Sequence, residues 1–383
     1  MKYNFDQIIN RRESESIKWN LYDEDVLPLW VADTDFLSPP SIVSSLQERI
    51  DHGIFGYSLI QESTKVTIQL WLLKRHNWKV NPDDIILIPG VIQGFNVTAK
   101  AYTNPGDSIL VQTPAYHPFF HVAKNSNINL ITSPLSRNSN GSYSVDFDHF
   151  QSFVTPETRV FILCNPQNPT GRAFSKSELL SMADVCLNHN IIICSDEIHS
   201  DLVFSETKHI PIASLSEDIS AITITLLSAS KTFNIAGLKS SVVVITNPIL
   251  RDRFVQAMNG FVGAVNLLGE VAMRSAFENG EDWLKKLLSY LEVNRDLLFD
   301  FVHNELPGVQ MSKPESTYLG WLDCKDTELK NPAGFFLDQA RVALNEGSWF
   351  GEDYSRFARL NFGCPKERLV IGLERLRTSL LQK

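Results

Sequence analysis

The chain contains 383 residues, of which 43% are hydrophobic and 21% are charged, and it carries a net charge of −9 with no cluster of basic residues. This composition is typical of a folded globular protein, and the charge argues against nucleic acid or an anionic membrane as the main partner. The polar N-terminus and the shortness of every apolar run predict a cytoplasmic protein with no membrane partner.

Short apolar runs recur through the first two thirds of the chain, with helix-like stretches between them. We expect strands at residues 84–88, 108–111, 160–163, 191–194 and 221–226. Residues 178–189 have helical spacing and lie between two of these runs, where a crossover helix belongs. Strands that are apolar on both faces and alternate with helices predict a mostly parallel sheet covered on both sides.

The pattern changes after residue 265. Amphipathic stretches at 269–278 and 283–303 are followed by short strands at 318–322 and 357–361, which alternate with helices. A chain of this length also exceeds the size at which a single core stops growing. We therefore predict an α/β protein with three parts, an N-terminal segment that joins the small domain (1–49), a large α/β domain (50–265) and a small C-terminal α+β domain (266–383).

Cysteine usage points to a reducing compartment. The five cysteines are scattered, without a CxxC pair and without metal-like spacing, at positions 164, 186, 194, 324 and 364. We expect buried free thiols and no metal site.

The turns that follow the predicted strands carry residues suited to one ligand, because ligands of open α/β sheets bind beyond the carboxyl ends of the strands. A glycine turn at 89–94 opens a helix and offers free backbone N–H groups to a phosphate. Tyr116, held in a proline-rich turn, could stack on a planar ring, although a lone tyrosine in a loop more often packs. Residues 165–171 (NPQNPTG) form a rigid turn with fixed amide side chains.

The last two turns carry a carboxylate and an amine. Asp196 directly follows an apolar strand, where a buried carboxylate needs a partner. A protonated pyridine nitrogen would be such a partner, and a helix N-cap role is the alternative. Lys231 lies just past the next strand and is a candidate for Schiff-base formation, whereas most single lysines are solvated surface residues. Since each turn lies at a strand end, we expect one shared site.

Three of these segments resemble signatures of the class I/II aminotransferase superfamily, the fold-type I enzymes that use pyridoxal 5′-phosphate (PLP): 165–171, 195–197 and 228–231. Further segments are similar to the branch of C–S β-lyases that includes the cystathionine β-lyases: 30–36, 55–57, 196–199, 230–237, 316–321 and 359–365. The resemblance implies the fold of the fold-type I PLP-dependent transferases, with a seven-stranded sheet in the large domain. It also implies a homodimer with shared active sites.

The resemblance assigns roles around the cofactor ring. It implies that Lys231 holds PLP as a Schiff base and later moves the substrate Cα proton. Asp196 would pair with the pyridine nitrogen, Asn168 would donate to the ring hydroxyl oxygen, and Tyr116 would stack on the ring. His199 stands where many aminotransferases have a tyrosine, and the lyase branch also has histidine there.

The remaining roles concern the phosphate, the substrate and the second subunit. The resemblance implies that the cofactor phosphate is bound by the backbone N–H groups of Val91 and Ile92, the Ser228 hydroxyl, Ser230 and Lys239. Lys239 stands where aminotransferases commonly have a phosphate-binding arginine, and a lysine lacks the forked geometry of the guanidinium. The resemblance also implies that Tyr57 of the neighbouring subunit is a catalytic and cofactor-binding residue. The implied substrate-binding residues are Arg359, Ala32 and Asn168, and Arg359 would clamp the substrate α-carboxylate.

The resemblance implies α,β-elimination from L-cystathionine or a related cysteine S-conjugate, giving a thiol, pyruvate and ammonia. An aminotransferase shares the first steps and is the alternative. A regulatory or binding protein on the same fold is a third possibility, because folds of this kind host several functions. Four residues could either wall the leaving group or belong to the core: Trp30, Tyr318, Trp349 and Phe350.

Overall fold

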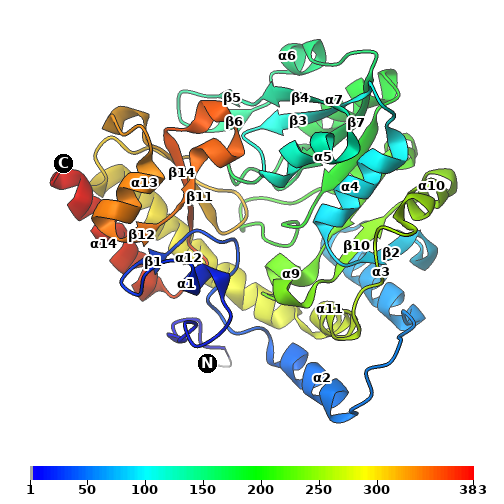
Figure 1. The fold of residues 1–383 in the computed structure, drawn as a ribbon, viewed down its shortest axis with the longest axis horizontal. Coiled ribbons are helices and arrows are strands. Elements are labelled where there is room, and N and C mark those ends of the chain that lie inside the picture. Colours follow the sequence, from blue (N-terminus) through cyan, green and yellow to red (C-terminus); the bar gives the residue numbers. More distant parts are fainter. Residues whose placement is uncertain (1–2) are drawn as a thin grey trace.

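The computed structural model describes residues 3–383, which form a large α/β lobe and a smaller lobe, as Figure 1 shows. Within these residues the central sheet has seven strands, in the spatial order β2 (Ile85–Ile88), β10 (Ser241–Val244), β9 (Thr223–Leu227), β8 (Ile192–Asp196), β7 (Thr158–Cys164), β3 (Ser108–Thr113) and β4 (Asn129–Pro134). Only β10 runs antiparallel to its neighbours in this part of the chain. The predicted α/β fold with a mostly parallel seven-stranded sheet is confirmed.

Helices cover both faces of this sheet, which is why its inner strands are apolar throughout. One face packs against α4 (Val91–Tyr102), α5 (Pro118–Ser126) and α10 (Pro248–Met258), through a core that contains Phe95, Phe119 and Phe254. The other face packs against α6 (Phe147–Ser152), α7 (Lys176–Asn188) and α8 (Glu217–Ala221). Each crossover helix therefore starts beside the strand end that precedes it, and the strand-end turns meet at one edge.

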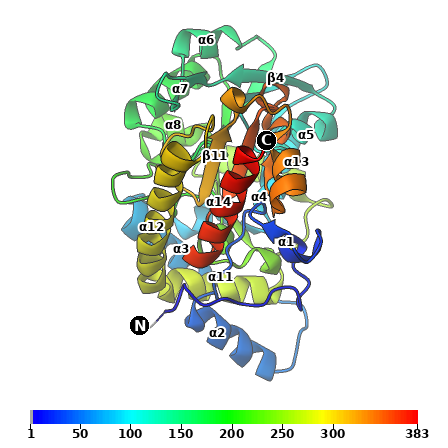
Figure 2. The same ribbon diagram turned by 90° about the vertical axis from the view of Figure 1, so that its left-hand side faces the viewer.

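The smaller lobe is built on an antiparallel sheet of β11 (Leu319–Asp323), β14 (Phe357–Asn361) and β13 (Asn345–Glu346). Figure 2 shows α12 (Glu281–Glu305) beside α14 (Lys366–Leu381), and both belong to this lobe. The N-terminal segment joins it, because β1 (Leu27–Pro28) pairs in parallel with β12 (Val342–Ala343). The short helices α1 (Ile17–Asn20) and α13 (Pro332–Phe335) complete it, and the domain boundaries stay a prediction.

A third group of helices projects below the sheet in Figure 1. Here α2 (Pro40–Asp51) and α3 (Glu62–His76) pack against α11 (Leu267–Asn279). The segment between α2 and α3 is extended, and its apolar side chains Ile54, Phe55, Tyr57 and Leu59 are exposed.

The state of the cysteines and the lengths of the helices bear on two further expectations from the sequence. All five cysteines are free, and four of them are buried while Cys164 is partly buried, which confirms the predicted free thiols. No helix formed by residues 3–383 combines the length and the apolar composition needed to cross a membrane.

A buried ionic cluster lies behind the sheet edge, between α3 and α9 (Ala229–Thr232). The Asp201 carboxylate accepts hydrogen bonds from Trp71 Nε1 at 3.2 Å and from Thr232 Oγ1 at 3.4 Å, and His76 Nε2 lies 3.4 Å away. Burial alone would raise the pKa of Asp201, but the neighbouring His76 and Arg75 and the hydrogen bond from Trp71 hold it below its ordinary value. The cluster thus ties α3 to the helix that carries Lys231.

Replacing Asp201 with alanine is expected to lower the free energy of unfolding by about 3–5 kcal/mol, because it leaves buried donors and a cation without their partner. Urea denaturation at pH 7 measures the loss. Asp184→Ala, at an exposed position of α7, is the matched control and should change stability by less than about 0.5 kcal/mol. Equal stability of the two variants would contradict the structural role of Asp201.

Candidate active site

A cavity of about 490 Å³ opens at the edge where the parallel strands end, at the junction of the two lobes. This size suits a small-molecule ligand. Most of the residues predicted from the sequence line it: Ala32, Val91, Ile92, Tyr116, Asn168, Asp196, His199, Ser230, Lys231, Lys239 and Arg359. The aromatic residues Trp30, Trp349 and Phe350 also contribute to its wall, whereas Tyr318 is buried behind it and donates its hydroxyl to the Ala32 carbonyl at 3.0 Å.

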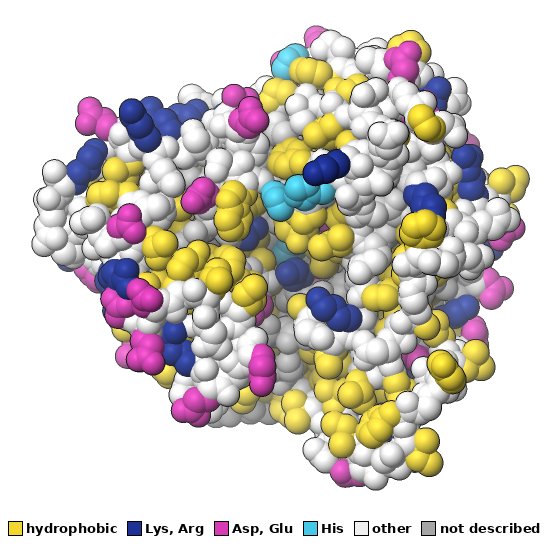
Figure 3. Space-filling model, viewed as in Figure 1, with side chains coloured by type: hydrophobic (Ala, Val, Ile, Leu, Met, Phe, Trp, Pro, Cys, Tyr) yellow, Lys and Arg dark blue, Asp and Glu magenta, His cyan; other side chains and the backbone are white. Residues whose placement is uncertain are grey.

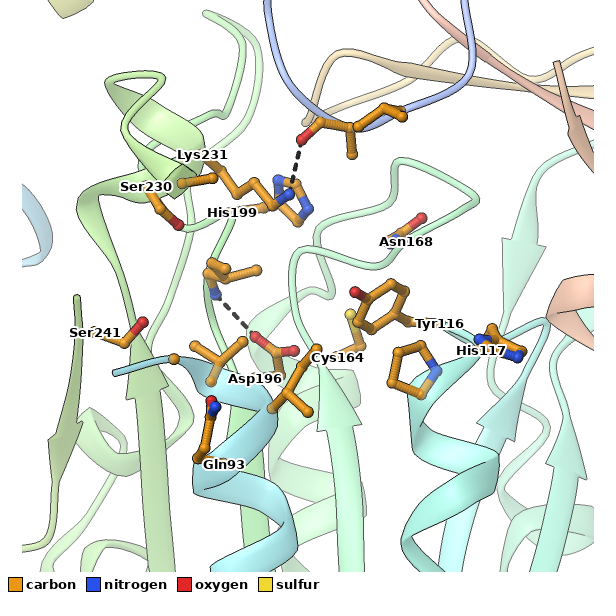
Figure 4. Close-up of a pocket in the computed structure, with 18 of the residues that line it drawn as sticks. Gln93, Tyr116, His117, Cys164, Asn168, Asp196, His199, Ser230, Lys231 and Ser241 are labelled. Atoms are coloured by element: carbon orange, nitrogen blue, oxygen red, sulfur yellow. Dashed lines mark hydrogen bonds between the residues drawn. The ribbon is translucent and has the colours of Figure 1, made fainter. Parts of the chain in front are cut away.

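Lys231 reaches the cavity from α9, the single helical turn that follows β9. Its Nζ donates to the carbonyl oxygen of Ala32 at 2.7 Å, as Figure 4 shows. Burial, together with the nearby charge of Arg359, lowers the pKa of Lys231 to about 8. A substantial fraction of this amine is therefore neutral, and hence nucleophilic, near physiological pH.

Asp196 ends β8 and projects into the same cavity, near Tyr116 and Cys164 in Figure 4. One carboxylate oxygen accepts the backbone N–H of Ile198 at 3.1 Å. Burial raises the pKa of Asp196 from 3.8 to about 7. A cation close to its free oxygen would restore the charged form, so the site favours a ligand that carries a protonated nitrogen.

Arg359 on β14 brings a buried positive charge to the opposite wall. Its Nη1 donates to Asn168 Oδ1 at 2.8 Å and its Nη2 to Asn345 Oδ1 at 2.6 Å, while Nε is buried without a partner. The guanidinium also stacks over the Phe350 ring, 4.9 Å from its centroid. Burial lowers the pKa of Arg359 to about 10, which leaves it charged at neutral pH and suited to a carboxylate.

His199 is buried, and its Nδ1 makes no hydrogen bond. Burial and the charge of Lys231 lower its pKa to about 3, so the imidazole is neutral and can donate or accept one hydrogen bond. An unpaired buried nitrogen facing a cavity is costly unless a ligand binds it.

These features fit PLP. Helix α4 starts at the cavity with Gly90 as its N-cap and no side-chain cap, which leaves the first backbone N–H groups at Val91 and Ile92 free for a phosphate. Lys239 adds a positive charge to the lining of the same cavity. Asp196 suits the pyridine nitrogen, while Asn168 and His199 are the polar groups available to the ring hydroxyl.

Two predicted residues lie elsewhere. The Ser228 hydroxyl caps α9, since it accepts the Ser230 N–H at 3.1 Å and donates to the Ser240 carbonyl at 2.8 Å, and Ser228 does not line the cavity. A hydroxyl at a helix start commonly satisfies the backbone in this way, and the contact of Ser228 with the phosphate stays a prediction. Tyr57 is fully exposed on the extended segment after α2 and does not line the cavity of its own chain.

The cavity also contains residues that sequence reasoning missed. Asn345 has the clearest role, as a partner of Arg359, but it lies on a two-residue strand with no pattern to mark it. Several others lie within a few residues of predicted ones and could have been found there: Gln93, His117, Cys164, Ile198 and Ser241.

Comparison with known proteins agrees with this geometry. The model of the family described as aminotransferase class I and II matches residues 24–376. Cystathionine beta-lyase PatB of Bacillus subtilis is 40% identical over 390 residues, covering 98% of this chain and 100% of PatB. Crystal structures of cystalysin from Treponema denticola, which contains PLP, and of the PLP-bound C–S lyase from Staphylococcus hominis match with TM-scores of 0.96 and 0.94, at 31% and 32% identity, and cover 100% of both chains in each case. The chain belongs to the class I and II aminotransferase family, on the branch that contains the cystathionine β-lyases.

Proposed function

We propose that this protein is a PLP-dependent C–S β-lyase that converts L-cystathionine or a related cysteine S-conjugate, with water, to a thiol, pyruvate and ammonia. The observation that carries the proposal is the Lys231 amine, which shares one cavity with the Asp196 carboxylate and the Arg359 guanidinium. The choice of lyase over aminotransferase is supported by the 40% identity to a cystathionine β-lyase over almost the whole chain.

Bound PLP supplies a protonated pyridine ring that accepts electron density from the substrate Cα. Asp196 is assigned to hold that nitrogen protonated, because only a nearby cation makes its buried carboxylate favourable. Arg359 is assigned to bind the substrate α-carboxylate, in place of part of its present contact with Asn168. With its depressed pKa, Lys231 Nζ is suited to take the Cα proton and return it.

The walls of the cavity suit a sulfur leaving group. Trp30, Trp349 and Phe350 place apolar surface in the cavity wall, and the Phe350 ring packs against the Arg359 guanidinium. Such a wall would exclude water from the Cβ–S bond and accept the uncharged part of a thioether, because sulfur packs well against aromatic rings.

The depressed pKa of Lys231 predicts how fast the cofactor-free protein takes up PLP. Only the neutral amine attacks the cofactor aldehyde, and a pKa of about 8 makes the neutral fraction about 10% at pH 7 and about 50% at pH 8. The rate of covalent attachment, followed by absorbance, should rise about fivefold between these values and level off above pH 9. A continued tenfold rise per unit up to pH 10 would contradict the depressed pKa.

The site is proposed to need a second copy of the chain. Tyr57 and its exposed apolar neighbours would contribute to the partner's cavity, which explains why they contact little within their own chain. Analytical ultracentrifugation should give twice the chain mass of 43.3 kDa. An active monomer would refute this arrangement.

The decisive assay incubates purified holoenzyme with L-cystathionine, with and without 2-oxoglutarate, and measures pyruvate and thiol. A lyase releases both without the keto acid. Conversion that stops after one amino group per site and resumes with 2-oxoglutarate would instead establish an aminotransferase. Release of no product under either condition, from any cysteine S-conjugate, would favour a regulatory role.

A further inference from the structure

Two exposed histidines face each other beside the active-site cavity. His117 follows the turn after β3 and precedes α5, and His121 lies one helical turn later. Their Nε2 atoms are 2.9 Å apart, with the two rings nearly perpendicular. Residues four apart on a helix share a face, and paired histidines at that spacing are a recurrent metal-binding arrangement.

The pair lies at the mouth of the cavity. His117 is one of the lining residues, and Figure 4 shows it at the edge of the group, beyond Tyr116. Its ring is 6.4 Å from the ring of Trp349, which also lines the cavity. Figure 3 shows histidine side chains at the surface, beside apolar side chains in the middle of this face.

The two nitrogens are hydrogen-bonded to each other at 2.9 Å, and this separation is compatible with chelation of a single ion. Metal–nitrogen bonds of about 2.0–2.1 Å joined to atoms 2.9 Å apart give an angle at the metal of about 90°. That angle belongs to square-planar or octahedral ions, whereas tetrahedral coordination would separate the nitrogens by about 3.4 Å. We propose that His117 and His121 together bind one divalent transition-metal ion of the Ni²⁺ or Cu²⁺ type at the cavity mouth.

The other neighbouring histidine rings in the described part of the chain differ from this pair in exposure. His76 and His209 also have neighbouring rings, but both are buried and are held by Asp201 and Glu197. Among residues 3–383 no group of three or more His, Cys, Asp or Glu side chains could hold a metal ion. An ion on His117 and His121 therefore keeps positions open to water or to a sulfur ligand that enters or leaves the cavity.

Isothermal titration of NiCl₂ into the holoenzyme, prepared without a polyhistidine tag, tests the proposal. One ion per chain should bind, and His121→Gln and His117→Gln should each weaken binding by about tenfold or more, since each removes one of two ligands. His149→Gln, which changes an exposed histidine on α6, is the matched control and should bind as the unmodified protein does. Absent binding, or binding that His121→Gln leaves unchanged, would overturn the proposal.

A second measurement locates the ion. Cu²⁺ quenches tryptophan fluorescence at short range, and Trp349 is the ring beside the pair. Adding CuSO₄ should quench part of the tryptophan emission of the holoenzyme. The variants Trp349→Phe and His121→Gln should not show this Cu²⁺-dependent decrease. Quenching of the same size in His121→Gln would place the ion elsewhere and reject the site. Because His121 is exposed, its variant should keep its unfolding temperature, which the same samples can report.

Discussion

Lys231→Ala is expected to lower pyruvate release from L-cystathionine by about 10⁴-fold or more. The variant lacks both the amine that attaches the cofactor and the base for the Cα proton, and residues that act as one unit lose nearly the whole rate when one is removed. Borohydride reduction followed by mass spectrometry of the peptide that contains residue 231 measures attachment independently of turnover. The unmodified chain should gain the cofactor mass there, and Lys231→Ala should not.

The matched control is Lys208→Ala, at an exposed lysine outside the cavity. It should keep full activity and full attachment. Covalent attachment in Lys231→Ala at another lysine, with activity retained, would show that the wrong lysine has been assigned.

Asp196→Asn is expected to reduce activity and, in the cofactor-free protein, to increase stability. The amide preserves the shape of the carboxylate but cannot balance the charge on a protonated ring nitrogen. Activity should fall by about 10²–10³-fold, the cost typical of removing one electrostatic contact at a reacting centre. The assay is pyruvate release at saturating PLP, so that weak cofactor binding does not mimic the effect.

The gain in stability follows from the raised pKa. Since the pKa of Asp196 is 3.8 in its ordinary state and about 7 in the folded protein, the folded state binds its proton more tightly than the unfolded state does. Its contribution to stability therefore falls as the pH rises from about 4 to about 7, by a total of about 4 kcal/mol. Because Asp196→Asn removes this loss, the free energy of unfolding of the cofactor-free variant, measured with urea, should exceed that of the unmodified protein at pH 7. The difference should shrink toward pH 4. A difference that does not depend on pH would contradict this explanation.

The parts of the fold and site that the sequence predicts are those with strong local patterns. Strands β2, β3, β7, β8 and β9 are buried on both faces, and each appears as an apolar run whose end carries a site residue. Helices α7, α11 and α12 follow from their spacing within a few residues. Strand β4 was missed because it lies at the sheet edge and exposes most of its side chains, so it has no continuous apolar run.

Contacts that depend on tertiary structure could not be predicted in this way. The pairing of Arg359 with Asn345 joins two short strands of the smaller lobe, and nothing in the local sequence marks Asn345 as a partner. Ser228 precedes Lys231 as the superfamily signature suggests, but nothing in the local sequence predicts that its hydroxyl also donates to the Ser240 carbonyl. His117 and His121 are four residues apart, but only the tertiary structure shows that His117 is the N-cap of α5 and that its ring meets that of His121.

The contacts of the N-terminal loop with the cavity bear on when the protein can first act during its synthesis. The carbonyl of Ala32 receives the Lys231 amine, and that of Trp30 receives Arg359, while β1 pairs with a strand more than 300 residues later. At about 5–20 residues per second the ribosome needs roughly 20–80 s to reach the C-terminal end. Until residues 342–359 have been made, the early loop lacks both β12 and Arg359, so a nascent or truncated chain can carry Lys231 without possessing a site. A chain interrupted before these residues should therefore have no activity, although it already contains Lys231, Asp196 and Asn168.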